Sequence, residues 1–194
     1  MNNFTKHLHW TDFFKRLQEY GSQYIDEHKA LSLSRMVGDS HTIIFRQTKD
    51  FPKWMQENLP LDILVIQLFA MNPKSIGMVH KDGIERKAAL NIPVINCNNG
   101  YMDWFTDGYE QITIDTDYTK IRITTTEKNF NEFRILDDPA HHCKIDVPSL
   151  VNTDVWHRID NSDNENYRYM LSIRFVGNPE FTDLVRIFDE FYLQ

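Results

Sequence analysis

A histidine and an aspartate stand two residues apart in the segment SIGMVHKDGIERKAALNIPV, residues 75–94. On an extended chain His80 and Asp82 project to the same side, so their imidazole and carboxylate can approach one metal ion. The alternative is a polar turn in which this spacing is accidental. A third ligand elsewhere in the chain is therefore needed before the pair can be interpreted as a metal site.

Of the eight histidines, His157 is the best candidate for this third ligand. It lies in a late predicted strand, and in an antiparallel β core an early and a late strand can pair side by side. The adjacent His141 and His142 would point to opposite faces of a strand, so at most one of them could join a site. The others lie in the N-terminal region or lack a partner at ligand spacing: His7, His9, His28 and His41.

His80, Asp82 and His157 together have the donor types of a facial triad made of two histidines and one carboxylate. This ligand set suits Fe(II) in non-haem oxygenases and leaves positions open for a cosubstrate and O2. A closed structural zinc site usually contains thiolates, and the chain has only Cys97 and Cys143, without Cys-x-x-Cys spacing. The three residues therefore favour a catalytic metal site.

Arg168 begins the predicted strand RYMLSIRF, eleven residues after His157. Along this strand Arg168, Ser172 and Arg174 alternate onto one face, so their side chains can point into a β core. A guanidinium binds both oxygens of a carboxylate at once, and it is costly to bury without an anion. The alternative is an ordinary surface ion pair of Arg168 with Asp160 or Glu165.

The hydrophobic pattern predicts the elements that must position these residues. Helical spacing predicts a helix over residues 11–28, with Thr11 as its cap, and a shorter helix over residues 51–59. From residue 61, roughly seven to nine short β-rich runs, including SIGMVH, FRILD and VWHRID, predict an antiparallel sandwich or barrel. The segment NNGYMDWFTDG is predicted as a break between strands. The apolar face of PEFTDLVRIFDEFY predicts a C-terminal helix.

Composition limits the classes of function. The chain of 194 residues suffices for one domain with a substantial core, since 41% of the residues are hydrophobic. The net charge of -7 argues against general nucleic-acid or membrane-surface binding. The chain lacks an apolar run of membrane-spanning length and a signal-peptide core. We therefore expect a soluble cytoplasmic protein with free thiols and with no nucleic-acid or membrane partner.

Two segments resemble the 2-oxoglutarate and Fe(II)-dependent oxygenases. HKDGIERKAALNIPV is similar to their proximal motif, a His-x-Asp followed by a Leu-Asn-Ile-Pro strand. VNTDVWHRIDNSDNENYRYMLSIRF is similar to their distal motif, in which an arginine follows the histidine by ten or eleven residues. The resemblance covers residues 62–176, and its layout is most similar to aspartyl/asparaginyl β-hydroxylase-like members and, more loosely, to prolyl-hydroxylase-like ones.

This resemblance implies a mainly β protein with flanking helices, built on a double-stranded β-helix, the jelly-roll core also found in cupins. Residues 1–60 would form a helical segment packed on the core, residues 61–176 the oxygenase core and residues 177–194 a C-terminal helix, all within one domain. His80, Asp82 and His157 would bind Fe(II).

The resemblance also implies a site for 2-oxoglutarate. Arg168 would hold the distal carboxylate of this cosubstrate, and Asn91 and Ser172 would face it. Arg174 shares a strand face with Arg168 and could compete for the anion, but the distance of Arg168 from His157 fits the motif better.

The implied function is hydroxylation of an amino acid, a peptide or another small organic substrate by O2, with release of succinate and CO2. Tyr101, Trp104 and Phe105 could line the substrate pocket or pack in the core under a hairpin. Arg86 and Lys87 could meet an acidic substrate or be solvated loop charges. Two other classes remain: a cupin-like metal-binding module without oxygenase activity, and a β-sandwich interaction domain that would keep the two motif histidines far apart.

Overall fold

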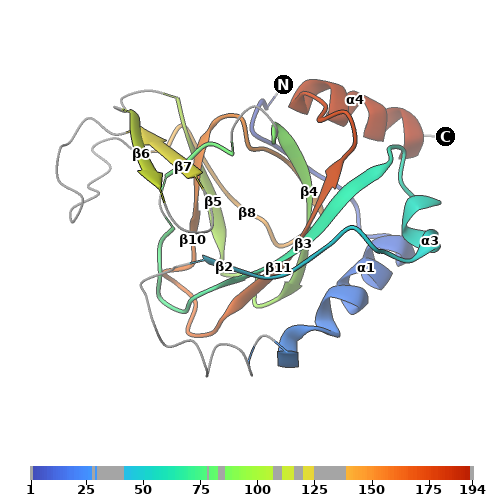
Figure 1. Ribbon diagram of the computed structural model, residues 1–194, viewed down its shortest axis with the longest axis horizontal. Helices are drawn as coiled ribbons and strands as arrows, with labels where there is room; N and C mark the ends of the chain where they lie inside the picture. Colours follow the sequence, from blue (N-terminus) through green and yellow to red (C-terminus); the bar gives the residue numbers. More distant parts are fainter. Residues whose placement is uncertain are drawn as a thin grey trace.

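The computed structural model of the protein describes residues 2–27, 29, 42–77, 79–82, 86–106, 111–115, 120–124 and 139–192. Its helices include α1 (Asp12–Ser22), α3 (Lys53–Gln56) and α4 (Phe181–Tyr192). Its strands are β1 (Thr5–His7), β2 (Thr42–Thr48), β3 (Ile63–Met71), β4 (Ala88–Ile95), β5 (Tyr101–Phe105), β6 (Gln111–Asp115), β7 (Lys120–Thr124), β8 (His141–Lys144), β9 (Ser149–Asn152), β10 (Trp156–Asp160) and β11 (Arg168–Phe175). The strands pair antiparallel, which makes the structure mainly β with flanking helices (Figure 1).

Within the described residues, six strands form a larger sheet in the order β1-β9-β4-β11-β3-β2, and three form a smaller sheet in the order β10-β5-β8. Strands β6 and β7 pair as a separate hairpin. Two isolated bridges, Ile76–Asp160 and His80–His157, place Ile76 and His80 along the other edge of β10. These two residues therefore extend the smaller sheet as an irregular edge.

Helices cover the outer face of the larger sheet. The side chain of Thr11 accepts a hydrogen bond from the backbone N–H of Phe14, which confirms Thr11 as the N-cap of α1. One apolar face of α1 and one of α4 pack with alternate residues of β3, β4 and β11 in the main core. In Figure 1 the helices lie at the right, away from β5 and β10. The main core includes Phe14, Leu17, Ile66, Leu68, Leu171, Ile173, Leu184 and Phe188.

The inner face of the larger sheet meets the smaller sheet. Side chains alternate along β11, so Arg168, Ser172 and Arg174 share the inner face with Met170. This face therefore carries polar side chains beside an apolar cluster that joins the two sheets. The cluster includes Ala89, Val151 and Met170 from the larger sheet and Met102 and Trp104 from the smaller sheet.

The structure departs from the predicted layout in several places. Residues 1–60, predicted to be helical, also contain β1 and β2, which form the two edges of the larger sheet. Strand β5 occupies YMDWF, which was predicted as a break, and β9 occupies SLVN, which was not predicted as a strand. The predicted strand FRILD, residues 133–137, lies outside the described residues. Cys97 and Cys143 are free thiols, as expected.

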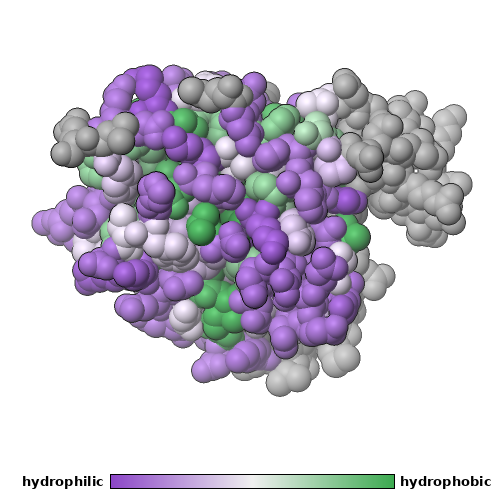
Figure 2. All heavy atoms as spheres, turned by 180° about the vertical axis from the view of Figure 1, so that it is seen from behind, coloured by the Kyte–Doolittle hydropathy of each residue, from purple (hydrophilic) through white to green (hydrophobic). Residues whose placement is uncertain are grey.

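The face of the molecule seen in Figure 2 is mostly hydrophilic, with separate apolar spots between polar side chains. The exposed apolar side chains come from different elements, for example Ile44 of β2, Ile95 of β4 and Phe191 of α4. None of the helices in the described part of the chain has the length and apolar character needed to cross a membrane.

Candidate metal centre

His80, Asp82 and His157 come together beside the inner face of the larger sheet. Each offers one ligand atom, and these atoms lie within 4.8 Å of one another. The Nε2 of His80 lies 3.5 Å from Asp82 Oδ1, and the ring centroids of the two histidines are 4.4 Å apart. His157 is 3% exposed, whereas His80 and Asp82 are partly exposed. The three residues could therefore bind a metal ion that small molecules can still reach.

Backbone pairing brings the three residues together. The N–H of His80 donates to the carbonyl of His157 at 2.9 Å, and the N–H of His157 donates back at 2.9 Å. The N–H of Asp82 donates to the carbonyl of Thr153 at 3.1 Å. Paired residues present their side chains on the same face, and so does a residue two positions further along an extended chain. The expected pairing of an early and a late segment is thus confirmed.

The imidazole of His157 is held in the form that a metal requires. Its Nδ1 lies 2.8 Å from the carbonyl oxygen of Val155. A carbonyl oxygen can only accept a hydrogen bond, so Nδ1 carries the proton and Nε2 keeps its lone pair for a metal. Burial and the nearby charge of His80 lower the pKa of His157 to about 4, so the ring is neutral near pH 7.

The carboxylate of Asp82 has a partner on each oxygen. Oδ1 faces His80, and Oδ2 accepts a hydrogen bond from Arg174 Nη2 at 3.0 Å. Burial raises the pKa of Asp82, but the hydrogen bond from His80, the charges that His157 and His80 carry at low pH and the charge of Arg174 together bring it below its ordinary value. Asp82 is therefore ionised at neutral pH, and Arg174 leaves Oδ1 turned toward the histidines.

Replacing Arg174 with methionine should lower the affinity for Mn(II) or Zn(II) by about 10- to 100-fold, the usual effect of losing a group that orients a metal ligand. Without the hydrogen bond to Oδ2, the carboxylate of Asp82 can rotate away from the histidines. A metal titration of the folded variant measures the effect. Arg186→Met is the control, because Arg186 is exposed on α4 and pairs with Glu190 of the same helix. An unchanged affinity in Arg174→Met would show that Arg174 does not position Asp82.

Arg168 is buried on the inner face and is 4% exposed. Its Nη1 donates to the carbonyl of Tyr101 at 3.3 Å, whereas its Nε has no hydrogen-bond partner among the described residues. Neither Asp160 nor Glu165 pairs with it in the described part of the chain, and Glu165 pairs instead with Lys74 at 2.7 Å. The surface ion pair considered above is therefore not formed.

Gly100 allows Arg168 to lie against the backbone at the start of β5. A Cβ atom added to Gly100 would lie 2.6 Å from Arg168 Cδ and 2.7 Å from its Nε, closer than real side-chain contacts. Tyr101, the partner of the guanidinium, is three residues from Trp104, which pairs with His157. The guanidinium therefore lies about 10 Å along the sheet from His157, at roughly 3.3 Å for each residue.

Asn91 and Ser172 lie on the inner face between the two arginines. They are cross-strand partners in the pairing of β4 with β11, and Ser172 stands between Arg168 and Arg174 on β11. Ser172 is 5% exposed, and Asn91 Oδ1 is buried without a hydrogen-bond partner among the described residues. These side chains therefore border the space that separates Arg168 from the metal ligands.

Other histidines considered from the sequence do not join this group where the structure describes them. His142 contacts the buried carboxylate of Asp103, with 2.5 Å between Nδ1 and Oδ1, and His141 packs against Trp104. His28 and His41 lie outside the described residues.

Of the two alternatives considered for the aromatic segment, a lining of the substrate pocket or packing in the core, the structure shows the second for Trp104 and Phe105, which lie in the strand β5. Trp104 is 0% and Phe105 is 2% exposed, so both pack in the core. Of the two cations near the metal motif, Lys87 pairs with Glu180, whereas Arg86 lines a pocket.

No family model matches the chain, and no curated protein matches it. The function is therefore inferred from the geometry of the site together with the resemblance of the two sequence motifs.

Proposed function

We propose that the protein is a 2-oxoglutarate- and Fe(II)-dependent oxygenase that hydroxylates an amino acid, a peptide or another small organic molecule. The observation that carries this proposal is the presence of a buried arginine, Arg168, without a carboxylate partner among the described residues, within reach of the group formed by His80, Asp82 and His157. A module that only binds metal has no need of this arginine.

The order of the strands supports a double-stranded β-helix. Successive segments of the chain alternate between the sheets: β3 lies in the larger one, Ile76 and His80 bridge to the smaller, β4 lies in the larger and β5 in the smaller. The return path runs from β8 in the smaller sheet to β9 in the larger, β10 in the smaller and β11 in the larger. Such alternation winds one chain through two facing sheets, as a jelly roll requires.

The donor set fits Fe(II). Two imidazoles and one carboxylate on one side of an ion leave the opposite positions for a chelating cosubstrate and O2. The His157 Nε2 lone pair, the ionised Asp82 and the partly exposed His80 supply these donors without a thiolate. Within the described residues, no cysteine joins the group.

The arginines also fit 2-oxoglutarate. Arg174 contacts Asp82 directly, so it lies too close to the metal to meet the far carboxylate of a chelated dicarboxylate. Arg168 lies further along the inner face, at a separation that an extended dicarboxylate can bridge, and its Nε needs an acceptor. Asn91 and Ser172 would lie alongside the bound molecule. We therefore assign the distal carboxylate to Arg168.

When bound, Fe(II) and 2-oxoglutarate supply the oxidising chemistry, in which O2 is consumed, 2-oxoglutarate becomes succinate and CO2, and a substrate C–H bond becomes C–OH. The chain supplies the positioning. Val155 fixes the tautomer of His157, and Arg174 fixes the orientation of Asp82. Arg168 orients the cosubstrate, and the apolar cluster around Met170 shields one side of it from water.

Thermal unfolding in the presence of Mn(II), a redox-inert substitute for iron, tests this function. Addition of N-oxalylglycine, an analogue of the cosubstrate, should raise the Tm further than Mn(II) alone. Binding to the native state at 100 times Kd stabilises it by about 2.7 kcal/mol, which corresponds to a shift of roughly 5 to 10 °C for a chain of this size. Without metal, the analogue alone should shift the Tm much less.

Succinate formation by the Fe(II)-loaded protein provides a second measurement that does not require the true substrate. Slow turnover that depends on both Fe(II) and 2-oxoglutarate would support the oxygenase. Stabilisation by metal without any further shift from N-oxalylglycine would instead identify a cupin-like metal-binding module.

A further inference from the structure

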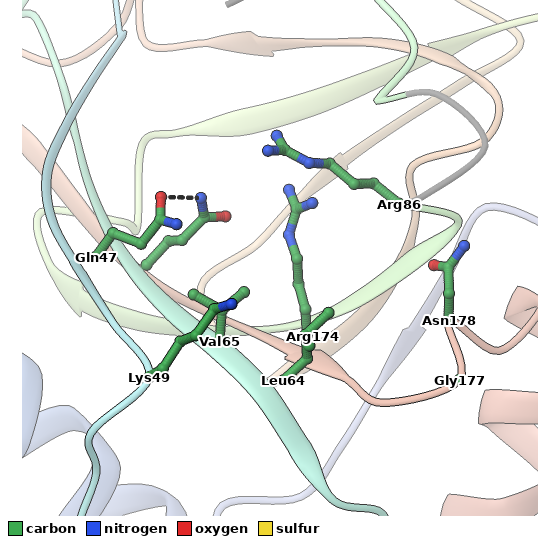
Figure 3. Close-up of a pocket in the computed structure, with 9 residues that line it drawn as sticks. Gln47, Lys49, Leu64, Val65, Arg86, Arg174, Gly177 and Asn178 are labelled. Carbon is green, nitrogen blue, oxygen red and sulfur yellow. Dashed lines mark hydrogen bonds between the residues drawn. The ribbon is translucent and has the colours of Figure 1, made fainter.

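A pocket of about 450 Å³ opens beside the metal centre (Figure 3). Arg174, which contacts Asp82, and Arg86 line this pocket, and their side chains point into the same space in Figure 3. Lys49 adds a third cation, and Gln47 adds an amide. A volume in this range suits a small-molecule ligand.

The positive charge of this pocket is only partly neutralised. The side chain of Arg174 is 9% exposed, and its Nε has no hydrogen-bond partner among the described residues. In the described chain no carboxylate pairs with Arg86 or Lys49, and none of the described residues that line the pocket is acidic. Burial lowers the pKa of Arg174 to about 10; Asp82 opposes this effect and the positive charge of Arg86 adds to it.

We propose that this pocket binds an oxyanion of the hydroxylation substrate, a carboxylate or a phosphate, with Arg86 as the main recognition residue. The inference rests on the proposed oxygenase function, because Arg174 joins the pocket to the metal centre through Asp82. Guanidinium groups bind both kinds of oxyanion in a planar, bidentate geometry. A substrate anchored at Arg86 would extend past Arg174 toward Asp82. The substrate class is therefore a small acidic molecule.

The pocket is distinct from the space assigned to 2-oxoglutarate. It is lined by β2, by β3 and by the end of β11 that carries Arg174, whereas Arg168 lies at the opposite end of β11. Gln47 and Gln67, which hydrogen-bond to each other at 3.0 Å, lie on neighbouring strands at this pocket. Their amides can select the remainder of the substrate by hydrogen bonding.

The test is a calorimetric titration of Zn(II)-loaded protein saturated with N-oxalylglycine, which keeps the cosubstrate site filled. The probes are N-acetylaspartate against its uncharged diamide N-acetylasparaginamide, and glycerol phosphate against glycerol. At least one anionic probe should bind, its neutral counterpart should not, and added salt should weaken the binding. Arg86→Gln should weaken it about tenfold, as expected for the loss of a hydrogen bond to a charged group. Lys49→Gln should have a smaller effect, because Lys49 is exposed.

Lys53→Gln is the matched control, since Lys53 carries the same charge on α3 and pairs with Glu57. Equal binding of charged and neutral probes, or unchanged binding in Arg86→Gln, would overturn the inference. If Arg86→Gln instead weakens the binding of N-oxalylglycine, the pocket belongs to the cosubstrate. The inference then fails, while the oxygenase proposal stands. If N-oxalylglycine does not bind the unaltered protein, the oxygenase proposal itself fails, and a separate titration of that analogue reveals this.

Discussion

Replacing His157 with alanine should lower the affinity for Fe(II) by at least about 100-fold, more than the loss of an orienting group would. His157 is the most deeply buried of the three candidate ligands, and its Nδ1 is already committed to Val155, so its Nε2 has no other role in the described structure. Anaerobic titration with Fe(II), or with Mn(II) followed by electron paramagnetic resonance, measures the change. Succinate formation should fall in parallel.

His9→Ala is the control for this experiment, since His9 is exposed and lies outside the metal group. It should leave metal affinity and activity unchanged. Circular dichroism establishes that the His157→Ala variant is folded. A folded variant that still binds Fe(II) with its original affinity would rule out the metal centre assigned to His80, Asp82 and His157.

Arg168→Ala is expected to weaken 2-oxoglutarate binding by about 2 to 5 kcal/mol, because the far carboxylate would be left buried and unpaired. Arg168→Lys should weaken it less, since the charge remains but the planar fork is lost. Gly100 packs directly against the side chain of Arg168, so the guanidinium has little freedom to move to another position. The measurement is a titration of anaerobic Fe(II)-loaded protein with 2-oxoglutarate, followed by the charge-transfer absorbance of the chelate.

Metal affinity should change little in either Arg168 variant. The Arg168 variants should thus weaken cosubstrate binding alone, whereas Arg174→Met should weaken metal binding. Arg186→Ala is the control, because Arg186 lies exposed on α4 and pairs within that helix. If 2-oxoglutarate affinity survives in Arg168→Ala but is lost in Arg174→Met while metal still binds, the cosubstrate arginine has been misassigned. If neither variant affects it, the oxygenase proposal is refuted.

The local part of the candidate site was predictable from the sequence. The two-residue spacing of His80 and Asp82, and the strand character around His157, follow from the period of an extended chain. The alternation of Arg168 and Arg174 onto one face of β11 follows from the same period. These relations depend on backbone geometry alone, so neither an alignment nor a structure was needed to expect them.

The contacts across the sheets were not predictable in this way. Arg174 was considered only as a rival for the cosubstrate anion, whereas it holds Asp82, a residue from a segment distant in sequence. This contact depends on how the two sheets close on each other, which no local pattern specifies. Strand β5 was missed because Asp103 and nearby asparagines and glycines resemble a turn. Asp103 is tolerated inside the sheet because Arg158 and His142 both pair with it.

The mutual hydrogen bonds of His80 and His157 have a consequence for the lifetime of the bound metal. They join the sheet edge at His80 to β10, although the two segments are far apart in the chain. A metal bound by both side chains would link the same two segments a second time, with little further loop-closure entropy to lose because the bridge already holds them together. Opening of this bridge would separate the two histidines and so speed dissociation of the metal, and a bound metal in turn opposes that opening. The residence time of the ion should therefore depend on how firmly this sheet edge is attached as well as on the strength of the ligand bonds.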